Sequence, residues 1–470
     1  MYQLSPSSKI LRVSRKATSY QHNILTAIKP LYYVSKIMGL APFSFIKHIT
    51  TNQITIQSSR RGNIYTFFLL LSIIICKAIS MVGRTKYTYP TLVTTLSITD
   101  FMVWVSSGIC MIASFVVATT WGQTKLIRIL RKMSYIDEML LEDSSNNYRK
   151  ISRFLTLQLM LLFSAVGGVC IYDYFVKIYH IGNILLSYVP SIYLNFLIMY
   201  AITAQFVNLI LLIWHRFRVL NSHLITKYNF DKTTIQNIDQ QCSDYISINN
   251  NHRQQWIINN QHFNDEENSN ENKQIKPKKK KSEVIIEIER KLSNDFQPLN
   301  FSQLRKLRIL HSLLNDCAVL TSSMYGFQIL LDMSNTLIRT TTYLYNIVTM
   351  AVGIYSSSSS QYVERKKHIF ILNMCWIPIF IVKMTSVALT CHLASSEANR
   401  TIILLQKSLL IQNIDQKVRT EIQEFIQQVQ NQKLQFKACG FFKIDLTMLK
   451  ALIVAIFTYL LILMQFYIPK

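Results

Sequence analysis

Charge and glycine are both scarce in this chain of 470 residues. Charged residues make up 16% of the sequence, glycine occurs 11 times, and hydrophobic residues make up 50%. A soluble chain of this length would form two or three domains and would carry more charge. The composition therefore argues against a soluble protein and suits a polytopic membrane protein whose polar residues lie in loops.

Motifs for metal binding and enzyme chemistry are missing as well. The eight cysteines include no Cys-x-x-Cys pair, which argues against a zinc site and against a disulfide framework. The sequence has no phosphate-binding loop, nucleophile elbow or zinc-enzyme motif, so we expect neither an enzyme nor a cofactor. A net charge of +25 can indicate nucleic-acid binding, but here the basic residues cluster between the apolar runs. We therefore expect no nucleic-acid partner.

Seven segments are long and apolar enough to cross a bilayer, which takes about twenty residues of helix. Two of them carry one lysine each, Lys77 and Lys383, and the longest carries Asp332 and Arg339. The sequence thus predicts an all-α polytopic membrane protein with seven transmembrane helices. In chain order the predicted spans are 64–82, 101–120, 154–172, 187–214, 318–355, 369–390 and 451–468.

The basic residues lie mainly on one side of these spans. Counted over alternate inter-span segments, Lys and Arg number 38 on the side of the N-terminus and 7 on the other side. The first acid in the chain is Asp100. Because basic segments near spans stay in the cytosol, we expect a cytosolic N-terminus and an extracellular C-terminus, in the plasma membrane.

The segments outside the spans differ in composition. Residues 221–300 are rich in Asn and Gln, with a lysine run at 276–281, and have too few apolar residues to fold. Residues 401–436 have apolar residues at helical spacing but are too polar to span, which predicts an amphipathic helix that needs a partner surface. The expected segments are a cytosolic N-terminal segment at 1–62, transmembrane helices one to four at 63–214, a largely disordered basic cytosolic loop at 215–300, a cytosolic helix leading into helices five and six at 301–394, a cytosolic amphipathic helical anchor at 395–443 and the last transmembrane helix at 444–470.

The last predicted helix carries polar residues on one face. Thr458 and Gln465 are seven residues apart, about two helical turns, so their side chains share a face. Lipid offers no hydrogen-bond partner to either side chain, so this face should contact protein or water. The same stretch, Thr458-Tyr459 followed by five hydrophobic residues and Gln465-Phe466, resembles the terminal signature of insect gustatory receptors.

Four further stretches resemble the same family and keep its order along the chain: 30–43, 216–221, 304–314 and 438–445. The resemblance implies a homotetramer in which the helix at 444–470 lines a central cation pore and the cytosolic anchor is shared between subunits. A hetero-oligomer with other gustatory receptors is the alternative assembly.

The resemblance also indicates the ligand. The stretch 325–330 and the long loop after the fourth span are similar to the fructose-sensing subgroup, although Leu460 stands where many sugar receptors have an acid. The expected function is a ligand-gated non-selective cation channel opened by an extracellular small-molecule tastant, a sugar such as fructose. A receptor channel for bitter compounds is the alternative within the family. Expected partners are the tastant, permeating cations and membrane lipid.

The signature residues are the candidate pore. Gln465 would line it and Phe466 would narrow it, a hydrophobic constriction that gates by dewetting. Thr458 and Tyr459 lie one to two turns away on the same helix. The alternatives are that Gln465 bonds to a neighbouring helix and that Tyr459 packs with its hydroxyl satisfied.

Two buried charges form another candidate site. Asp332 and Arg339 lie seven residues apart and share a helical face. An isolated charge at mid-bilayer costs at least about 3 kcal/mol, so each should have a partner or face water. They would belong either to a ligand-coupled polar cluster or to a structural interhelical pair.

A tastant site needs polar and aromatic groups that converge on a cavity. Aromatic rings would cover the face of a sugar, while Asn, Thr, Asp and Arg would bind its hydroxyls. Trp376 could equally be an interfacial anchor, and the threonines could be ordinary packing. The candidate ligand residues are Asn373, Trp376, Thr340, Thr342, Tyr343, Asp173 and Tyr174.

Two other classes of membrane protein fit the sequence less well. A G-protein-coupled receptor keeps its N-terminus outside and has Glu/Asp-Arg-Tyr at the end of its third helix, where this chain has Asp173-Tyr174 on the outer end. Its last span would also carry Asn-Pro-x-x-Tyr, which is missing here. A transporter would show an internal repeat and paired broken helices, and the sequence has neither.

Overall fold

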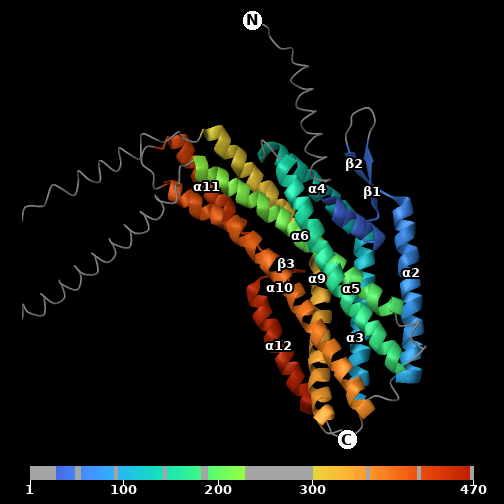
Figure 1. Ribbon diagram of the computed structural model, residues 1–470. Coiled ribbons are helices and arrows are strands. Elements are labelled where there is room, and N and C mark those ends of the chain that lie inside the picture. Colours follow the sequence, from blue (N-terminus) through green and yellow to red (C-terminus); the bar gives the residue numbers. More distant parts are fainter. Residues whose placement is uncertain are drawn as a thin grey trace, which may run out of the picture. The chain divides into compact units, whose positions relative to one another are not determined.

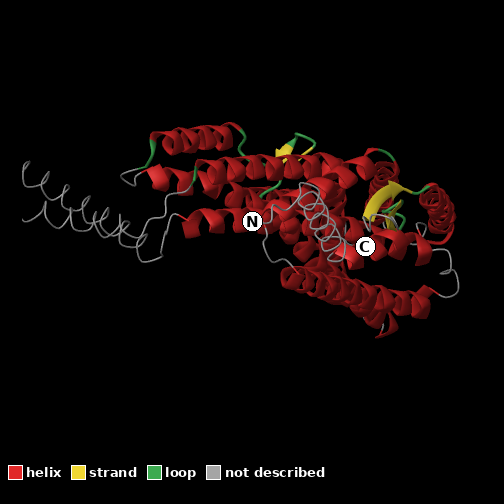
Figure 2. Cartoon of the chain, turned by 90° about the horizontal axis from the view of Figure 1, so that it is seen from above, coloured by secondary structure: helices red, strands yellow, loops and turns green. Residues whose placement is uncertain are grey.

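Helix dominates the protein. The computed structural model describes residues 28–47, 54–88, 94–140, 145–181, 189–227, 300–355, 360–409 and 414–465. Strands in this part of the chain are confined to two short hairpins (Figure 2). The helices, drawn in Figure 1, are α2 (Arg60–Gly83), η1 (a π-helical turn, Arg84–Thr88), α3 (Thr94–Thr119), α4 (Trp121–Leu140), α5 (Ser145–Ile181), α6 (Val189–Lys227), α9 (Phe301–Tyr355), α10 (Ser360–Leu409), α11 (Gln416–Asn431) and α12 (Leu446–Gln465).

Within the described residues, six stretches of helix have the length and apolar composition of a membrane span: Arg60–Lys86, Leu96–Thr119, Arg149–Val176, Ile192–Thr226, Lys367–Leu409 and Leu446–Gln465. Each coincides with a predicted span. The seventh predicted span, 318–355, lies in the 55-residue helix α9. Its polar residues make this helix less hydrophobic than the other six spans. Those residues, Asp332 and Arg339 among them, are buried against other helices, so α9 tolerates them without exposing charge to lipid. The predicted all-α membrane fold is confirmed.

The chain forms two compact units. The first comprises Met1–Arg218, Ile309–Asn399 and Gln432–Lys470, and the second Val219–Arg308 and Arg400–Asn431. The helices α6, α9 and α10 contribute to both. The expected membrane spans therefore fall mainly in the first unit.

The second unit contains the amphipathic helix that the sequence indicates. Val418, Ile422, Phe425 and Val429 of α11 are buried at helical spacing. Arg308 of α9 forms ion pairs with two acids of α11, the buried Glu421 (2.7 Å) and Glu424 (2.9 Å).

Two expectations about this region need correction. The helical stretch predicted at 401–436 is two separate helices, since α10 ends at Leu409, α11 covers only Gln416–Asn431, and residues 433–436 are not helical. The predicted loop at 215–300 begins as helix, because α6 continues to Lys227 with Phe217, Leu220 and Leu224 fully buried. The rest of that loop, 228–299, lies outside the described residues.

Helix α6 is the centre of the first unit, with 83% of its span window buried. Phe196 and Tyr200 of α6 pack with Val166 and Cys170 of α5 and with the aromatic and aliphatic face of α10. Further along, Ala204 contacts the cluster that α5 forms with Leu31. Burial of α6 on several sides explains how it holds residues from three other helices in place.

An ion pair anchors the C-terminal half of α6 to α4, a helix that is not among those expected from the sequence. Arg216 donates from Nε and Nη2 to both carboxylate oxygens of Asp137, at 3.0 and 2.9 Å. The side chains are 1% and 0% exposed. Such a bidentate pair satisfies both groups, and removing one partner would leave the other charge buried.

Two antiparallel hairpins were also not predicted. Strands β1 (Phe43–Lys47) and β2 (Ile54–Ser58) pair just before α2. Strands β3 (Lys437–Ala438) and β4 (Phe442–Lys443) pair just before α12, and their turn places both Cys439 (φ 49°) and Gly440 (φ 82°) in the left-handed region. Two consecutive positive φ angles are the signature of a tight hairpin turn.

The β3–β4 hairpin is fastened to α9. Ser322 Oγ donates to the carbonyl of Lys437 at 3.0 Å and accepts from the N–H of the same residue at 3.2 Å. One turn further along α9, a Cβ on Gly326 would lie 3.1 Å from the Cys439 nitrogen and 3.3 Å from the Lys437 oxygen. A side chain at this position would push the hairpin backbone away by a few tenths of an ångström, so the close approach favours glycine. The hairpin ties the chain leading into α12 to the middle of α9.

Candidate functional site

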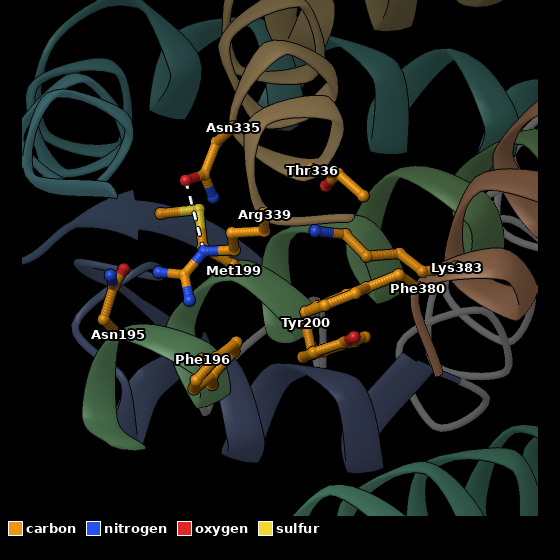
Figure 3. Close-up of a pocket in the computed structure, with 9 residues that line it drawn as sticks. All are labelled: Asn195, Phe196, Met199, Tyr200, Asn335, Thr336, Arg339, Phe380 and Lys383. Atoms are coloured by element: carbon orange, nitrogen blue, oxygen red, sulfur yellow. Dashed lines mark hydrogen bonds between the residues drawn. The ribbon is translucent and has the colours of Figure 1, made fainter. Parts of the chain in front are cut away.

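A pocket lies between α6, α9 and α10 in the first unit (Figure 3). The pocket is small, with room for about one water molecule as the side chains stand. The lining residues are Asn195, Phe196, Met199, Tyr200, Asn335, Thr336, Arg339, Phe380 and Lys383.

Helical spacing explains why these side chains converge. The four residues of α6 are at positions i, i+1, i+4 and i+5, and the three of α9 are at i, i+1 and i+4. The two of α10, Phe380 and Lys383, are three residues apart. Each helix therefore presents one face to the pocket.

The first wall of the pocket is aromatic. The rings of Phe196 and Trp376 stack with centroids 4.2 Å apart, and Phe380 stacks on Trp376 at 5.8 Å and on Tyr343 at 5.6 Å. Trp376 and Tyr343, both expected to contact ligand, thus lie behind the lining residues and support them. Stacked rings of this kind form a rigid apolar platform.

The second wall carries charge. Lys383 Nζ donates to Asp332 Oδ1 at 2.5 Å, joining α10 to α9, and Thr203 of α6 donates to the other carboxylate oxygen at 3.3 Å. The partner of Asp332 is therefore on another helix, and Arg339 is held separately. The sequence already predicts that each charge has a partner, but spacing along one helix cannot identify Lys383 as that partner.

Arg339 is positioned by an amide and a ring. Its Nε donates to Asn335 Oδ1 at 3.2 Å, and its guanidinium carbon lies 4.4 Å from the centroid of Phe196 (Figure 3). The same Asn335 oxygen accepts from Ser106 of α3 at 3.0 Å. The cation–π contact contributes on the order of 1–2 kcal/mol in a desolvated site.

Some buried polar atoms at or near the pocket have no hydrogen-bond partner among the described residues. They include the hydroxyl of Tyr200 and Oδ1 of Asn195, each on a residue only 2% exposed, and Nδ2 of the nearby Asn373 on α10. A buried polar atom left without a partner costs about 1–3 kcal/mol. A ligand with hydroxyl or similar groups would supply the missing bonds.

None of the seven predicted ligand residues is among those that line the pocket. Thr340 and Thr342 donate to the carbonyls of Thr336 and Ile338 within α9, at 2.8 Å each. Asp173 accepts from Tyr193 at 2.7 Å, and the ring of Tyr174 meets Phe175 edge-on. Their roles in ligand binding stay predictions.

Several lining residues are not among the predicted ligand residues, although the sequence carries a signal for them. Lys383 is one of the few charges inside a predicted span, and Asn195 and Asn335 are amides within predicted spans. An ionisable or polar residue at membrane depth is by default a candidate for function. Pairing Lys383 with Asp332, however, requires the packing of α9 against α10.

The predicted pore residues are on α12. Tyr459 is 53% exposed, Gln465 is exposed, and Thr458 donates to the Val454 carbonyl of its own helix at 2.9 Å. Phe466 lies outside the described residues. The only buried residue of the described α12 is Met448, so the helix has little contact with its own chain.

The start of α12 is fixed by a capping carboxylate. Asp445 Oδ1 accepts from the Thr447 hydroxyl and from the N–H groups of Thr447 and Met448, the last two at 2.9 and 3.3 Å. These bonds, with the Thr447 hydroxyl as the largest contribution, hold the pKa of Asp445 below its ordinary value. The helix therefore begins at a defined residue, directly after the hairpin docked on α9.

The described part of the chain is a helical bundle in which six helices have the length and composition of membrane spans, which is the architecture of a multi-pass membrane protein. A sequence model of the family described as 7tm Chemosensory receptor matches residues 28–469. The chain therefore belongs to the seven-transmembrane chemosensory receptor family, whose members are multi-pass proteins of the plasma membrane.

One curated relative is the "Gustatory receptor for sugar taste 43a" of Drosophila melanogaster. It is 28% identical over 168 residues, which are 35% of this chain and 36% of that receptor. The match thus spans about a third of the relative, and the predicted resemblance to gustatory receptors agrees with it.

Solved structures of an insect olfactory receptor have a similar fold. The receptor OR5 from Machilis hrabei gives a TM-score of 0.56 at 11% identity, covering 94% of this chain and 98% of that one. The same receptor in complex with eugenol gives 0.56 at 12% identity, covering 95% and 100%. At such low identity the likeness shows the fold alone.

Proposed function

We propose that this receptor is a ligand-gated, non-selective cation channel for taste, opened by a small polyhydroxyl compound such as fructose. The observation that carries the proposal is the pocket between α6, α9 and α10. It combines an aromatic platform with amide, hydroxyl and charged groups. The chemistry of this lining suits a sugar, because the C–H faces of a sugar pack on rings and its hydroxyls bond to polar side chains; the lining side chains would have to move apart to admit it.

The exposed α12 supports the channel part of the proposal. A helix with one buried residue in its own chain presents a long apolar surface that needs lipid or other subunits. We assign it to the centre of a homotetramer, with Thr458, Tyr459 and Gln465 along the ion path and Phe466 at the gate. The N-terminus would be cytosolic and Lys470 extracellular, as the distribution of basic residues predicts.

The route from pocket to pore would run through α9. This helix lines the pocket with Asn335 and Arg339 and holds the β3–β4 hairpin through Ser322 and Gly326. The hairpin leads directly into α12. A shift of α9 on ligand binding would therefore reach the start of the pore helix through one docked turn.

Expression of the full chain alone, in cells without taste receptors, tests the proposal. Calcium imaging and whole-cell recording against sugars and bitter compounds should give a cation current that survives blockade of G proteins. A current evoked by bitter compounds only would replace the sugar assignment. A response abolished by the blockade would overturn the channel and favour a G-protein-coupled mechanism.

Variants of the pocket and the gate separate the two parts of the proposal. Phe380→Ala should raise the half-maximal sugar concentration about tenfold or more without changing single-channel conductance, because the ring forms the platform for the ligand. Gln465→Ala should change conductance or ion selectivity without shifting that concentration. Reversed effects, with protein at the cell surface in normal amounts, would contradict the placement of the two sites.

A further inference from the structure

A short helix at residues 28–37 precedes the first membrane span (dark blue in Figure 1). Leu31 on this helix packs in one buried cluster with Leu155, near the start of the apolar part of α5. At the end of the helix, the Tyr65 hydroxyl of α2 donates to the Ile37 carbonyl at 2.7 Å. The short helix is therefore fixed to both α2 and α5.

The outward face of the short helix mixes cations with apolar residues. Lys29, Tyr33, Lys36 and Ile37 are all exposed and lie at positions i, i+4, i+7 and i+8, which share one face. A face in water would be polar throughout, and a face in hydrocarbon would lack charge. Lysine beside tyrosine and isoleucine is instead typical of a helix at the headgroup level of a membrane.

The two neighbouring spans change from basic to apolar surface beside this helix. On α2, the exposed Arg60 and Arg61 are followed one turn later by the exposed Ile64. On α5, the exposed Arg153 is followed directly by the exposed Phe154. A change of this kind marks the level at which hydrocarbon gives way to headgroups.

The cations of the short helix and of α2 lie near one another. Arg61 is one turn before Tyr65, and Lys36 adjoins Ile37. The hydrogen bond between Tyr65 and Ile37 therefore brings these two cations together, although they are far apart in the sequence. Both side chains are exposed, so they can meet the same headgroup.

In the described part of the chain, this surface carries no carboxylate. The sequence has no acid before Asp100, and α5 has none before Asp173. The three arginines form no ion pair with any described residue, and the Lys36 ammonium donates to the Tyr32 hydroxyl at 2.9 Å. Clustered cations next to a membrane span attract anionic lipid, because their charge is not neutralised within the protein.

We infer that this surface binds anionic phospholipid of the surrounding membrane. The charged headgroup lies on Lys36, Arg60 and Arg61, and the acyl chains lie along the exposed apolar side chains that follow on α2. The ligand is an amphiphile because the charged and apolar parts of the surface adjoin. These residues are on the side expected to be cytosolic, where the anionic lipids of a plasma membrane are concentrated.

The lipid preference of the purified full chain tests the inference. Fluorescent phosphatidylserine and phosphatidylcholine with the same acyl chains are titrated onto the protein in neutral detergent micelles, and energy transfer from tryptophan reports binding. Phosphatidylserine should bind at least about fivefold more tightly, the size expected for one cation at an anionic headgroup, and salt should weaken the preference. Equal binding of the two lipids would overturn the inference. The measurement needs neither tastant nor current, so it is independent of the proposed function.

The ratio of the two affinities is insensitive to how much protein folds, since both lipids are measured on one sample. Lys36→Gln/Arg60→Gln/Arg61→Gln should bring the ratio close to one. Lys36→Arg/Arg60→Lys/Arg61→Lys should retain it, because charge alone is required. A preference that survives the glutamine variant, or that is lost in the charge-conserving variant, would overturn the assignment of these residues.

A matched control removes the same net charge elsewhere. Lys417, Arg419 and Lys433 are exposed cations on α11 and shortly after it. Lys417→Gln/Arg419→Gln/Lys433→Gln should leave the ratio unchanged. An equal loss of preference in this control would show that only the net charge of the protein matters, and would overturn the inference.

Two other occupants of the surface would give different results. Water-soluble glycerophosphoserine, which lacks acyl chains, should compete poorly. Competition as strong as that of the intact lipid would show a site for small anions and would overturn the inference. A second copy of the chain would be the occupant if the wild type had no lipid preference and the glutamine variant changed the oligomeric state, measured by light scattering.

Discussion

Helices α6 and α12 are both apolar enough to cross a membrane, yet they have opposite surroundings. In α6, 83% of the span window is buried within the chain, whereas in α12 the share is 6%. The apolar side chains of α6 contact neighbouring helices of the same subunit. Those of α12, such as Val454 and Leu461 at 64% and 66% exposure, do not.

The difference shows that hydropathy predicts whether a helix can lie in a membrane. It does not predict whether the helix packs against its own subunit. Polar residues reveal more. On α6, Thr203 and Arg216 bond to side chains of α9 and α4. On α12, Thr458 bonds only within its own helix and Gln465 is exposed. A polar residue on an exposed membrane helix indicates a partner outside the subunit or a water path.

The largest expected effect comes from truncating a buried side chain of α6. Phe206 is 0% exposed and packs its ring against Tyr325 of α9, with centroids 5.7 Å apart. Phe206→Ala should lower the free energy of unfolding by about 3–5 kcal/mol, because it leaves a cavity among helices that cannot close up. Thermal unfolding of the detergent-solubilised protein measures it. A loss below about 1 kcal/mol would mean that α6 is not the tightly packed centre of its unit.

A pH effect of intermediate size is expected where α6 meets His311. This ring on α9 donates from Nε2 to the Ala398 carbonyl at 3.2 Å and meets Phe217 of α6 edge-on. Burial lowers its pKa from 6.5 to about 4. The folded state therefore binds the proton more weakly than the unfolded state, so stability is complete above pH 6.5 and falls as the pH drops towards 4.

The loss at pH 5 should be about 2 kcal/mol, from the linkage between protonation and folding. Thermal unfolding between pH 7.5 and 4.5 measures it. His311→Phe removes the titrating group and keeps an aromatic ring against Phe217, so its stability should change less over the same range. If the two pH profiles have the same slope below pH 6.5, His311 does not carry the effect.

A smaller effect is expected where α9 contacts the β3–β4 hairpin, which leads into α12. Gly326→Ala should cost about 1–3 kcal/mol by crowding the hairpin backbone next to Cys439 and Lys437. Ser322→Ala removes two hydrogen bonds to Lys437 and should cost about 1–2 kcal/mol. Both should reduce the maximal current more than they shift the half-maximal ligand concentration, measured by whole-cell recording. The reverse pattern would place the hairpin outside the path from pocket to pore.

The sequence predicts the spans and much less of the site. Apolar runs locate the helices, and charges within them single out Asp332, Arg339 and Lys383. Periodicity cannot tell that Asp332 pairs with Lys383, 51 residues away, or that Trp376 stands behind Phe196 rather than in the pocket. Such contacts depend on which faces of three helices meet. The β3–β4 hairpin was missed because its strands are two residues long and carry no alternating pattern.

The smallest expected effect is the most direct test of the difference between α6 and α12. Phe457 of α12 is the counterpart of Phe206, the same side chain at 59% exposure. Phe457→Ala should change the unfolding of the isolated subunit by no more than about 0.5 kcal/mol, because little is packed against the ring. Met448→Ala, at the buried residue of the same helix, is the matched control and should destabilise the subunit by about 2 kcal/mol or more. If Phe457→Ala instead weakens the assembly, seen as a shift from oligomer to monomer by light scattering, α12 contacts other subunits. A large loss of stability in the isolated subunit would show that α12 packs within its own chain after all.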